Sequence, residues 1–192
     1  MDSKLQNLIK ECSRNLSEAA VNNEHPWRLF TAANTDLAGN PQSRYVVMRD
    51  FDENLQKVFF FTDLRSTKVP ALKRQPRISL CFFDPLAKLQ LEIKADVKVH
   101  NNNETCQKYW DATPWYSLQC YYMKETPGEE LEAPFLLKAN KMNDKEAYRY
   151  FTVIECTALA WDILLLTAEG NQRASCTFRE NGEVSASTWI AP

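Results

Sequence analysis

Glycine and histidine are scarce in this chain. Its 192 residues include 4 glycines and 2 histidines, whereas a chain of this length with average composition would carry about 13 glycines. The glycines lie too far apart in the sequence to form a glycine-rich phosphate loop. His25 and His100 are also distant from each other, which gives little support to a histidine-based zinc site or catalytic triad. We therefore expect no bound metal, and we expect the chemistry to come from a molecule that the protein binds.

Paired cysteines and long apolar runs are also missing. The six cysteines form no C-x-x-C pair, and the N-terminal sequence MDSKLQ is charged rather than apolar. The most apolar stretch, residues 158–166, is interrupted by Asp162 and is far shorter than the roughly 20 apolar residues of a membrane-spanning helix. These features predict reduced thiols in a cytoplasmic protein that does not enter a membrane.

The overall composition is that of an ordinary globular protein. Hydrophobic residues make up 44% of the chain and charged residues 25%, with a formal net charge of -2. A chain of this size buries roughly 70% of the surface that it exposes when unfolded, so it can fold without disulfides or metals. We expect residues 1–192 to form one domain.

The hydrophobic pattern predicts one N-terminal helix followed by many strands. Residues 1–22 show helical spacing behind a possible cap at Asp2 or Ser3. Residues 88–100 alternate strictly between apolar and polar, and such a strand spans roughly 43 Å, long enough that it should coil as barrel strands do. Further strands are predicted at 27–33, 43–51, 57–62, 78–84, 151–160, 161–166, 173–178 and 184–190.

Shorter helices and one polar segment separate these strands. We expect helices from Ser66, as the N-cap, to about residue 74, over 103–122 and near 144–149, and an exposed loop or lid over 124–144. The pattern favours an α+β, mainly β protein in which peripheral helices pack around an antiparallel barrel.

Two segments carry candidate binding groups. Arg44 and Arg49 end a largely apolar stretch, but an odd spacing places them on opposite faces of a regular strand, so a ligand shared by both requires a bulge or a strand end at Arg49. Ser66, Thr67 and Lys68 stand at a predicted helix start, where backbone N–H groups, hydroxyls and a cation could hold a phosphate. A solvated basic surface would show the same residues.

Taken together, these motifs resemble the FMN-binding split barrel of the pyridoxamine 5'-phosphate oxidase family. The motifs are R-x-x-x-x-R at 44–49, F-T-x-x-x-S-x-K at 61–68 and Q-L-E-I at 90–93, and the resemblance covers roughly residues 27–192. It implies a Greek-key-like split barrel, FMN as the cofactor and a homodimer with the flavin site at the subunit interface. It also implies that Arg44, Ser66, Thr67 and Lys68 hold the flavin phosphate and ribityl chain, and that the ring is approached by Val46, Val47, Arg49, Phe61, Thr62 and Gln90. Arg49 stands where a lysine is usual, and Thr67 where an arginine is usual.

The substrate residues of that family are matched only in part. Tyr109, Ser117 and Arg173 stand at matching positions, whereas Thr113 replaces an arginine and Ser175-Cys176 replaces a His-Asp pair. The sequence therefore looks closer to a poorly characterised oxidase-related branch than to the vitamin B6 oxidase itself.

The resemblance implies a flavin-dependent oxidoreductase acting on a small molecule, phosphorylated or not. One alternative is a split barrel that binds flavin or haem without turnover, with His25 or His100 as the available haem ligands. Another is a barrel that binds single-stranded nucleic acid through the basic run at 64–83. The chain carries more acidic than basic residues, which disfavours nucleic-acid binding, so we expect no nucleic-acid partner.

Overall fold

The computed structural model describes residues 2–132 and 142–192. The strands are β1 Leu29–Thr35, β2 Pro41–Asp52, β3 Lys57–Asp63, β4 Arg77–Asp84, β5 Leu89–Asn101, β6 Phe151–Leu165, β7 Gln172–Phe178 and β8 Val184–Ile190. The helices are α1 Ser3–Val21, α2 Lys68–Arg74, α3 Glu104–Ala112, α4 Trp115–Leu118 and α5 Asp144–Tyr150, with a 3-10 turn, η1, at Gln119–Tyr122. Apart from the boundary predicted between residues 160 and 161, which lies inside β6, the strand ends differ from those predicted by at most two residues.

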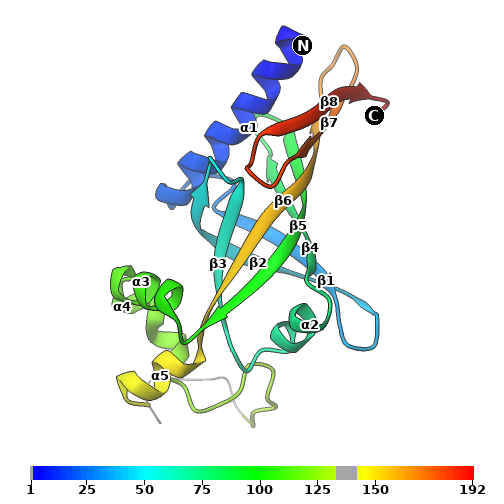
Figure 1. The fold of residues 1–192 in the computed structure, drawn as a ribbon. Helices are drawn as coiled ribbons and strands as arrows, with labels where there is room; N and C mark the ends of the chain where they lie inside the picture. Colours follow the sequence, from blue (N-terminus) through cyan, green and yellow to red (C-terminus); the bar gives the residue numbers. More distant parts are fainter. Residues whose placement is uncertain (1, 133–141) are drawn as a thin grey trace.

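Six strands close into an antiparallel barrel. Their order is β3-β2-β1-β4-β5-β6, and pairing between β3 and β6 completes the circuit. Because β4 returns to pair with β1 after the β1-β2-β3 meander, the connection is of Greek-key type. The predicted α+β, mainly β split barrel with peripheral helices is confirmed. In Figure 1, α1 and the β7–β8 hairpin lie at one end of the barrel, and α2, α3, α4 and α5 at the other.

One long strand changes partners and splits the barrel. The sequence predicted two strands at 151–160 and 161–166, but β6 is continuous over 15 residues. Its first part pairs with β3, and its second part, from Ala160, pairs with β7. A shift in register opposite Lys94 and Ala95 leaves Leu159 as the extra residue between these two parts. A β-bulge therefore bends the strand where a break was predicted.

The barrel interior and α1 share one hydrophobic core. Leu89, Leu91, Ile93 and Ala95 of β5 are buried in this core, as the alternation predicted. Leu5, Leu8, Cys12, Leu16 and Ala19 of α1 pack into the same core. Of the two candidate caps, Asp2 and Ser3, the helix uses Asp2, whose carboxylate accepts a hydrogen bond from the Lys4 backbone N–H at 3.0 Å.

A second apolar cluster lies outside the barrel, beneath α3 and η1. The sequence predicted one helix over 103–122, but the structure divides it into α3, α4 and η1, with a break at Thr113 and Pro114. Proline restricts the preceding residue and lacks a backbone donor, so the break is expected there. Aromatic and aliphatic side chains fill the cluster: Phe59, Leu118, Tyr121, Tyr122, Phe151 and Val153.

The connecting segments differ in part from the predictions. Ser66 is not the N-cap of α2; Thr67 occupies that position, and no side chain caps the helix. Of the predicted loop or lid over 124–144, residues 133–141 lie outside the described part of the chain, whereas 124–132 contain no helix or strand. Within the described ranges, no helix has the length and apolarity needed to cross a membrane.

Candidate functional site

The centre of the candidate site is Lys68, at the start of α2. Its ammonium nitrogen lies 2.9 Å from the Thr62 hydroxyl oxygen and 2.6 Å from that of Ser66. Thr62 comes from the end of β3, and Ser66 from the turn that follows, so the β3–α2 connection brings the three groups together. Burial lowers the pKa of Lys68, and the nearby charge of Arg44 lowers it further.

Arg44 forms the second cationic group of this site. Its guanidinium group donates to the Ala32 carbonyl at 3.1 Å and to the side-chain oxygen of Asn34. Burial lowers its pKa. In the described part of the chain, neither Arg44 nor Lys68 forms an ion pair with a carboxylate. The nearest negative charge that acts on Lys68 is that of Asp63, which pairs with Arg65 and only partly offsets the lowering of the Lys68 pKa.

A cavity of about 470 Å³ opens beside these cations. Arg44, Thr67 and Lys68 line it. Asp36 also lines it, but its carboxylate accepts hydrogen bonds from the backbone of Ala38 and Asn40 and is held in its own turn. The arrangement suits an anion with several oxygen atoms, because the cations and hydroxyls around the cavity are all potential donors.

Arg49 lies in a β-bulge, as a ligand shared with Arg44 would require. The pairing of β2 with β3 shifts between Met48 and Asp50, which leaves Arg49 as the extra residue. Its guanidinium carbon lies 5.3 Å from the centre of the Phe61 ring, and one nitrogen lies 3.4 Å from the Ser117 hydroxyl. Arg49 therefore contacts Phe61 and Ser117 rather than Arg44 and Lys68.

The other predicted substrate residues are engaged in contacts within the protein. The Tyr109 hydroxyl donates to an Asp50 carboxylate oxygen at 2.7 Å, and burial, together with this contact, raises the pKa of Tyr109. Arg173 forms a two-point ion pair with Asp162, at 2.9 Å and 2.8 Å. The Tyr109 hydroxyl proton and two of the three guanidinium nitrogens of Arg173 are therefore already engaged.

Gln90 and Arg173 lie far from Lys68 in the same chain. Gln90 is next to Leu164 and Arg173 in the sheet, whereas Thr62 is next to Thr152, which pairs with Asn101. Gln90 and Asn101 stand at opposite ends of β5, whose 13 residues extend over roughly 43 Å. The half-buried Val46 and Val47 point to opposite faces of β2, with Val46 against the barrel core.

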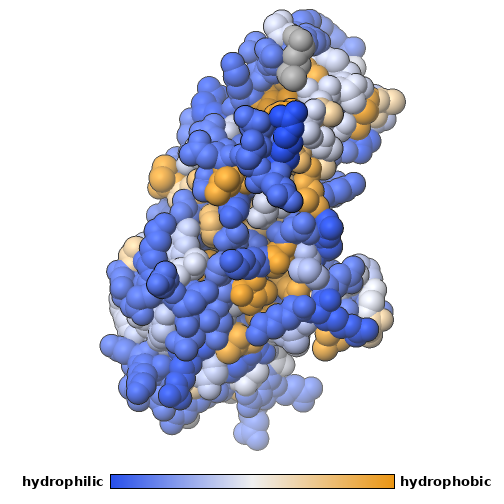
Figure 2. Space-filling view, viewed as in Figure 1, coloured by the Kyte–Doolittle hydropathy of each residue, from blue (hydrophilic) through white to orange (hydrophobic). Residues whose placement is uncertain are grey.

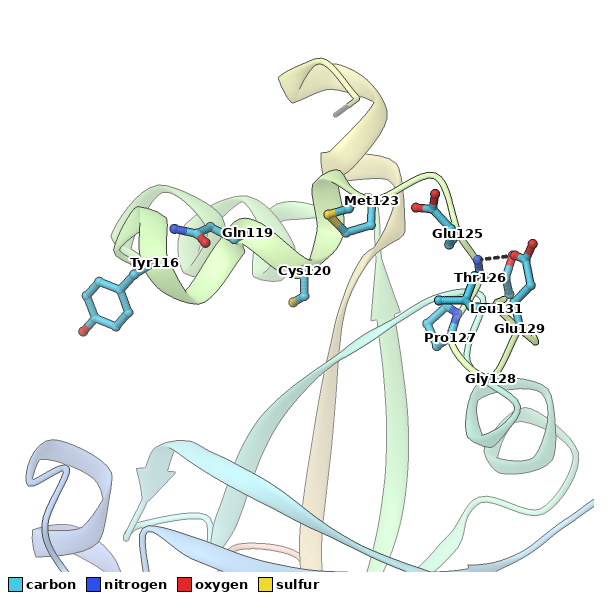
Figure 3. A pocket seen from close by; sticks show the side chains of 10 residues that line it. All are labelled: Tyr116, Gln119, Cys120, Met123, Glu125, Thr126, Pro127, Gly128, Glu129 and Leu131. Carbon is cyan, nitrogen blue, oxygen red and sulfur yellow. Dashed lines mark hydrogen bonds between the residues drawn. The ribbon is translucent and has the colours of Figure 1, made fainter. Parts of the chain in front are cut away.

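Sequence reasoning missed a second cavity, of about 460 Å³, between η1 and residues 125–131 (Figure 3). It also missed how Arg65 holds this segment. The Arg65 guanidinium pairs with both oxygens of Asp63, stacks on Tyr150 at 4.0 Å and donates to the Lys124 carbonyl at 3.0 Å. The adjacent pair Thr126-Pro127 and the turn at Gly128 were the available sequence signals, but they could not show which element the segment packs against.

Comparison with known proteins identifies the family. A sequence model described as "Pyridoxamine 5'-phosphate oxidase, FMN-binding domain" matches residues 5–101, half of the chain. The chain belongs to this family. FMN is the cofactor of this pyridoxamine 5'-phosphate oxidase family domain, and the partly buried cations Arg44 and Lys68 fit its phosphate.

Curated relatives match this family member over part of their length. A pyridoxine/pyridoxamine 5'-phosphate oxidase from Rhodopirellula baltica is 33% identical over 86 residues, which cover 44% of this chain and 37% of that protein. Pyridoxine/pyridoxamine 5'-phosphate oxidase 2 from Arabidopsis thaliana is 33% identical over 103 residues, covering 50% of this chain and 52% of that protein. The chain thus spans about half or less of these relatives.

Solved structures match the pyridoxamine 5'-phosphate oxidase-like fold over the whole chain. A pyridoxamine 5'-phosphate oxidase-related, FMN-binding protein from Nostoc punctiforme has a TM-score of 0.75 at 19% identity, with 100% of both chains covered. PhzG from Burkholderia lata, solved with tetrahydrophenazine-1-carboxylic acid, has a TM-score of 0.76 at 15% identity, covering 100% of this chain and 98% of that one. At these identities the likeness concerns the fold alone.

Proposed function

We propose that this FMN-binding protein is an FMN-dependent oxidoreductase that acts on a small molecule, and that Arg44, Ser66, Thr67 and Lys68 hold the flavin phosphate. The observation that carries the proposal is the pair of partly buried cations, Arg44 and Lys68, which form no ion pair among the described residues. A phosphate dianion between them replaces their mutual repulsion with charge-assisted hydrogen bonds.

The energies are sufficient for this role. Three charge-assisted hydrogen bonds at about 1.5–3 kcal/mol each give roughly 5–9 kcal/mol before the cost of ordering. Micromolar affinity requires about 8 kcal/mol. Burial of the apolar flavin ring supplies the remainder, and we assign contacts with it to Val46, Val47, Arg49, Phe61, Thr62 and Gln90.

The reactivity in this proposal belongs to the cofactor. When bound, FMN supplies the redox chemistry, since its ring accepts a hydride from the substrate and returns the electrons to oxygen or another acceptor. The protein anchors the phosphate through Lys68 and Arg44. Arg49 and Phe61 form one side of the ring site, and the helices α3 and α4 shield it from water.

The proposal includes a homodimer, because one chain cannot bring Gln90 to the Lys68 site. Tyr45, Leu29 and Phe83 are 77%, 57% and 46% exposed, and the strand registers place all three on the outer face of β2, β1 and β4. Figure 2 shows apolar side chains reaching the surface over the middle of the molecule, where the barrel strands lie. Such an exposed apolar face suits a second copy of the chain.

A visible spectrum and an FMN titration test the proposal. The purified protein should be yellow or should take up FMN with micromolar affinity or tighter, and should sediment as a dimer. Arg44→Ala or Lys68→Ala should weaken FMN binding at least tenfold, which is about 1.4 kcal/mol. A colourless protein that does not take up FMN would end the proposal.

An FMN-binding protein without turnover is the second candidate. It is favoured by the engagement of Tyr109 with Asp50 and of Arg173 with Asp162, which occupies two of the predicted substrate groups. Haem binding is less well supported, because His25 contacts Trp27 and Glu18, and His100 is held by Glu155 and Asn103. Reduction of the bound flavin by a substrate under anaerobic conditions separates an enzyme from a carrier. A cytoplasmic location remains part of the proposal.

A further inference from the structure

The cavity beside Arg44 and Lys68 is larger than a phosphate group requires. Its volume is about 470 Å³, which falls within the range of whole small-molecule sites, about 300–1,000 Å³. The four oxygen atoms of a phosphate group fill roughly 120 Å³ if each takes the volume of a water molecule in the liquid, about 30 Å³. A bound phosphate therefore leaves most of the cavity for another part of the ligand.

The flavin ring does not account for this remaining space. None of the residues that we assign to the ring is among the described residues that line the cavity. Arg49 contacts the Phe61 ring and the Ser117 hydroxyl instead, and Thr62 meets the site through the ammonium group of Lys68. From the phosphate position, the ring and the cavity therefore lie in different directions.

The cavity lies between the β1–β2 loop and α2, which are neighbours in Figure 1. Two hydrogen bonds hold the loop beside the helix. The Arg74 guanidinium donates to the Leu37 carbonyl at 2.9 Å, and the Thr35 hydroxyl donates to the Gln75 side-chain oxygen at 2.9 Å. The two walls are therefore fixed relative to each other.

The walls carry groups that suit a nucleoside. Leu37 of the loop and Pro70 of α2 are apolar and exposed, so they can contact the faces of a flat heterocycle. The exposed Gln42 has an amide oxygen that can accept a hydrogen bond from the amino group of a purine. Ligand sites typically combine apolar walls with a few polar groups in this way.

Positive charge exceeds negative charge around the cavity. Within residues 2–132 and 142–192, Arg44, Lys68 and Arg74 form no ion pair. Asp36 is the only carboxylate among the described lining residues, and it accepts hydrogen bonds from its own turn. Asp63, whose charge also acts on Lys68, pairs with Arg65. This excess favours a ligand with more than one phosphate group.

Two features keep the cavity accessible. Thr67, which stands where the family usually has an arginine, lines the cavity and is exposed, and its short side chain leaves space that an arginine would fill. Gln42 and Arg44 lie on the opposite face of β2 from Tyr45, so the apolar face that we assign to the dimer does not include the cavity.

We propose that this cavity accepts a nucleotide unit joined to the flavin phosphate, so that the site takes flavin adenine dinucleotide, FAD, as well as FMN. The second phosphate shares the positive charge of Arg44 and Lys68, and the adenine ring lies between Leu37 and Pro70. This inference rests on the proposed function, since it extends the range of cofactors at the same phosphate site.

Titrations of the flavin-free protein with FMN and with FAD test the proposal. FAD should bind at least as tightly as FMN, because the cavity holds the added nucleotide. Leu37→Ser removes one apolar wall and should weaken FAD binding at least about threefold while leaving FMN binding unchanged. Leu55→Ser is the matched control, because Leu55 is an exposed leucine in the turn between β2 and β3 and does not line this cavity. It should change neither affinity.

Thr67→Arg tests whether the space itself admits the nucleotide. The longer side chain fills part of the cavity, so the ratio of the two affinities should shift toward FMN by at least about tenfold. The added positive charge acts in the opposite sense, because by itself it favours the ligand with more phosphate groups. A shift toward FMN therefore reports loss of space rather than a change in charge.

Three results would overturn the inference: weaker binding of FAD than of FMN by the unmodified protein, an equal or absent effect of Leu37→Ser on the two flavins, or no shift toward FMN in Thr67→Arg. Failure of the unmodified protein to bind either flavin would instead remove the proposed function. Titration with ADP, which has the diphosphate and adenosine of FAD without the flavin, would then decide the nucleotide site alone. ADP binding that Leu37→Ser weakens would support the site, and absence of ADP binding would refute it.

Discussion

The ammonium nitrogen of Lys68 lies 2.6 Å from the hydroxyl oxygen of Ser66, the residue that the sequence predicts as a helix cap. The hydroxyl accepts from Lys68 instead of from the backbone of α2, and α2 begins without a side-chain cap. A missing cap typically costs about 1 kcal/mol. The start of α2 is thus locally less stable than a capped helix, but its side chains place hydrogen-bond donors around a cavity. Such a loss of local stability is typical of a binding site.

Replacing Lys68 with methionine should separate binding from stability. Because burial and Arg44 lower the pKa of Lys68 in the folded protein, its positive charge at neutral pH opposes folding. We expect Lys68→Met to leave the free energy of unfolding of the FMN-free protein unchanged or higher, and to weaken FMN binding at least tenfold. Urea unfolding and FMN titration measure the two effects.

Lys73→Met is the matched control, since Lys73 is an exposed lysine of the same helix. It should change neither quantity appreciably. A Lys68→Met protein that loses more than about 1 kcal/mol of stability without FMN, as an ordinary destabilising substitution does, would show that Lys68 supports the fold and is not held there for a ligand.

FMN affinity should fall at alkaline pH. The pKa of Lys68 is lowered in the FMN-free protein, and a bound phosphate would raise it by favouring the charged form. Affinity is therefore full below the lowered pKa and falls as pH rises from there, at lower pH than for an ordinary lysine, whose pKa is about 10.4. FMN titrations from about pH 7 to 10 measure the decline. In Lys68→Arg the guanidinium keeps its charge over this range, so an equally steep decline in that variant would refute the assignment.

Glu155 should stabilise the fold in a pH-dependent way. Burial alone would raise its pKa, but hydrogen bonds from Lys57 and His100, at 2.8 Å and 2.9 Å, outweigh burial and lower it. Its contribution is therefore present above the unfolded pKa, about 4.3, and is lost as pH falls through the lower folded value. Glu155→Gln should cost about 1.5–3 kcal/mol at pH 7.

Chemical unfolding at several pH values tests this prediction. The difference in free energy of unfolding between Glu155→Gln and the unmodified protein should become smaller as pH falls below about 4. Glu183→Gln is the control, because Glu183 forms an exposed ion pair with Arg179 and should have no resolvable effect. If this difference in free energy of unfolding stays constant as the pH falls, Glu155 acts through packing rather than through its charge.

Gly182 should tolerate no side chain. It has φ +80°, and a Cβ atom there would meet the Asn54 carbonyl oxygen and lie 2.8 Å from the Asn54 carbonyl carbon. The turn before β8 thus packs directly on the turn between β2 and β3. Gly182→Ala should cost at least about 1 kcal/mol more than Gly39→Ala, since Gly39 has a similar φ of +89° but open space around it. Thermal unfolding of the two variants provides the comparison, and equal melting temperatures would contradict the contact.

The strands could be predicted because their signals are local. The alternation of β5 and the ends of β8 follow from neighbouring residues alone. The bulge at Leu159 could not be predicted, because it depends on β6 changing partners from β3 to β7. The cap of α2 was misassigned for a similar reason, since the Ser66 hydroxyl is engaged by the side chain of Lys68.

The candidate site was predictable in residue type but not in arrangement. The sequence singled out Arg44 and Lys68, and the fold brings them together. It could not show that Arg49 joins Ser117, that Asp162 neutralises Arg173, or that Gln90 lies at the far end of β5, because each of these depends on strand register. The pocket beside Glu125 depends on how a loop packs, for which the sequence carries no periodic signal.

The most direct test of the account compares FMN with riboflavin, which lacks the phosphate. If Arg44, Ser66 and Lys68 hold the phosphate, the unmodified protein binds FMN at least tenfold tighter than riboflavin, a difference of about 1.4 kcal/mol or more. Lys68→Ala should lose most of this preference, and Lys73→Ala should keep it. Equal affinity of the unmodified protein for FMN and riboflavin would contradict the central claim.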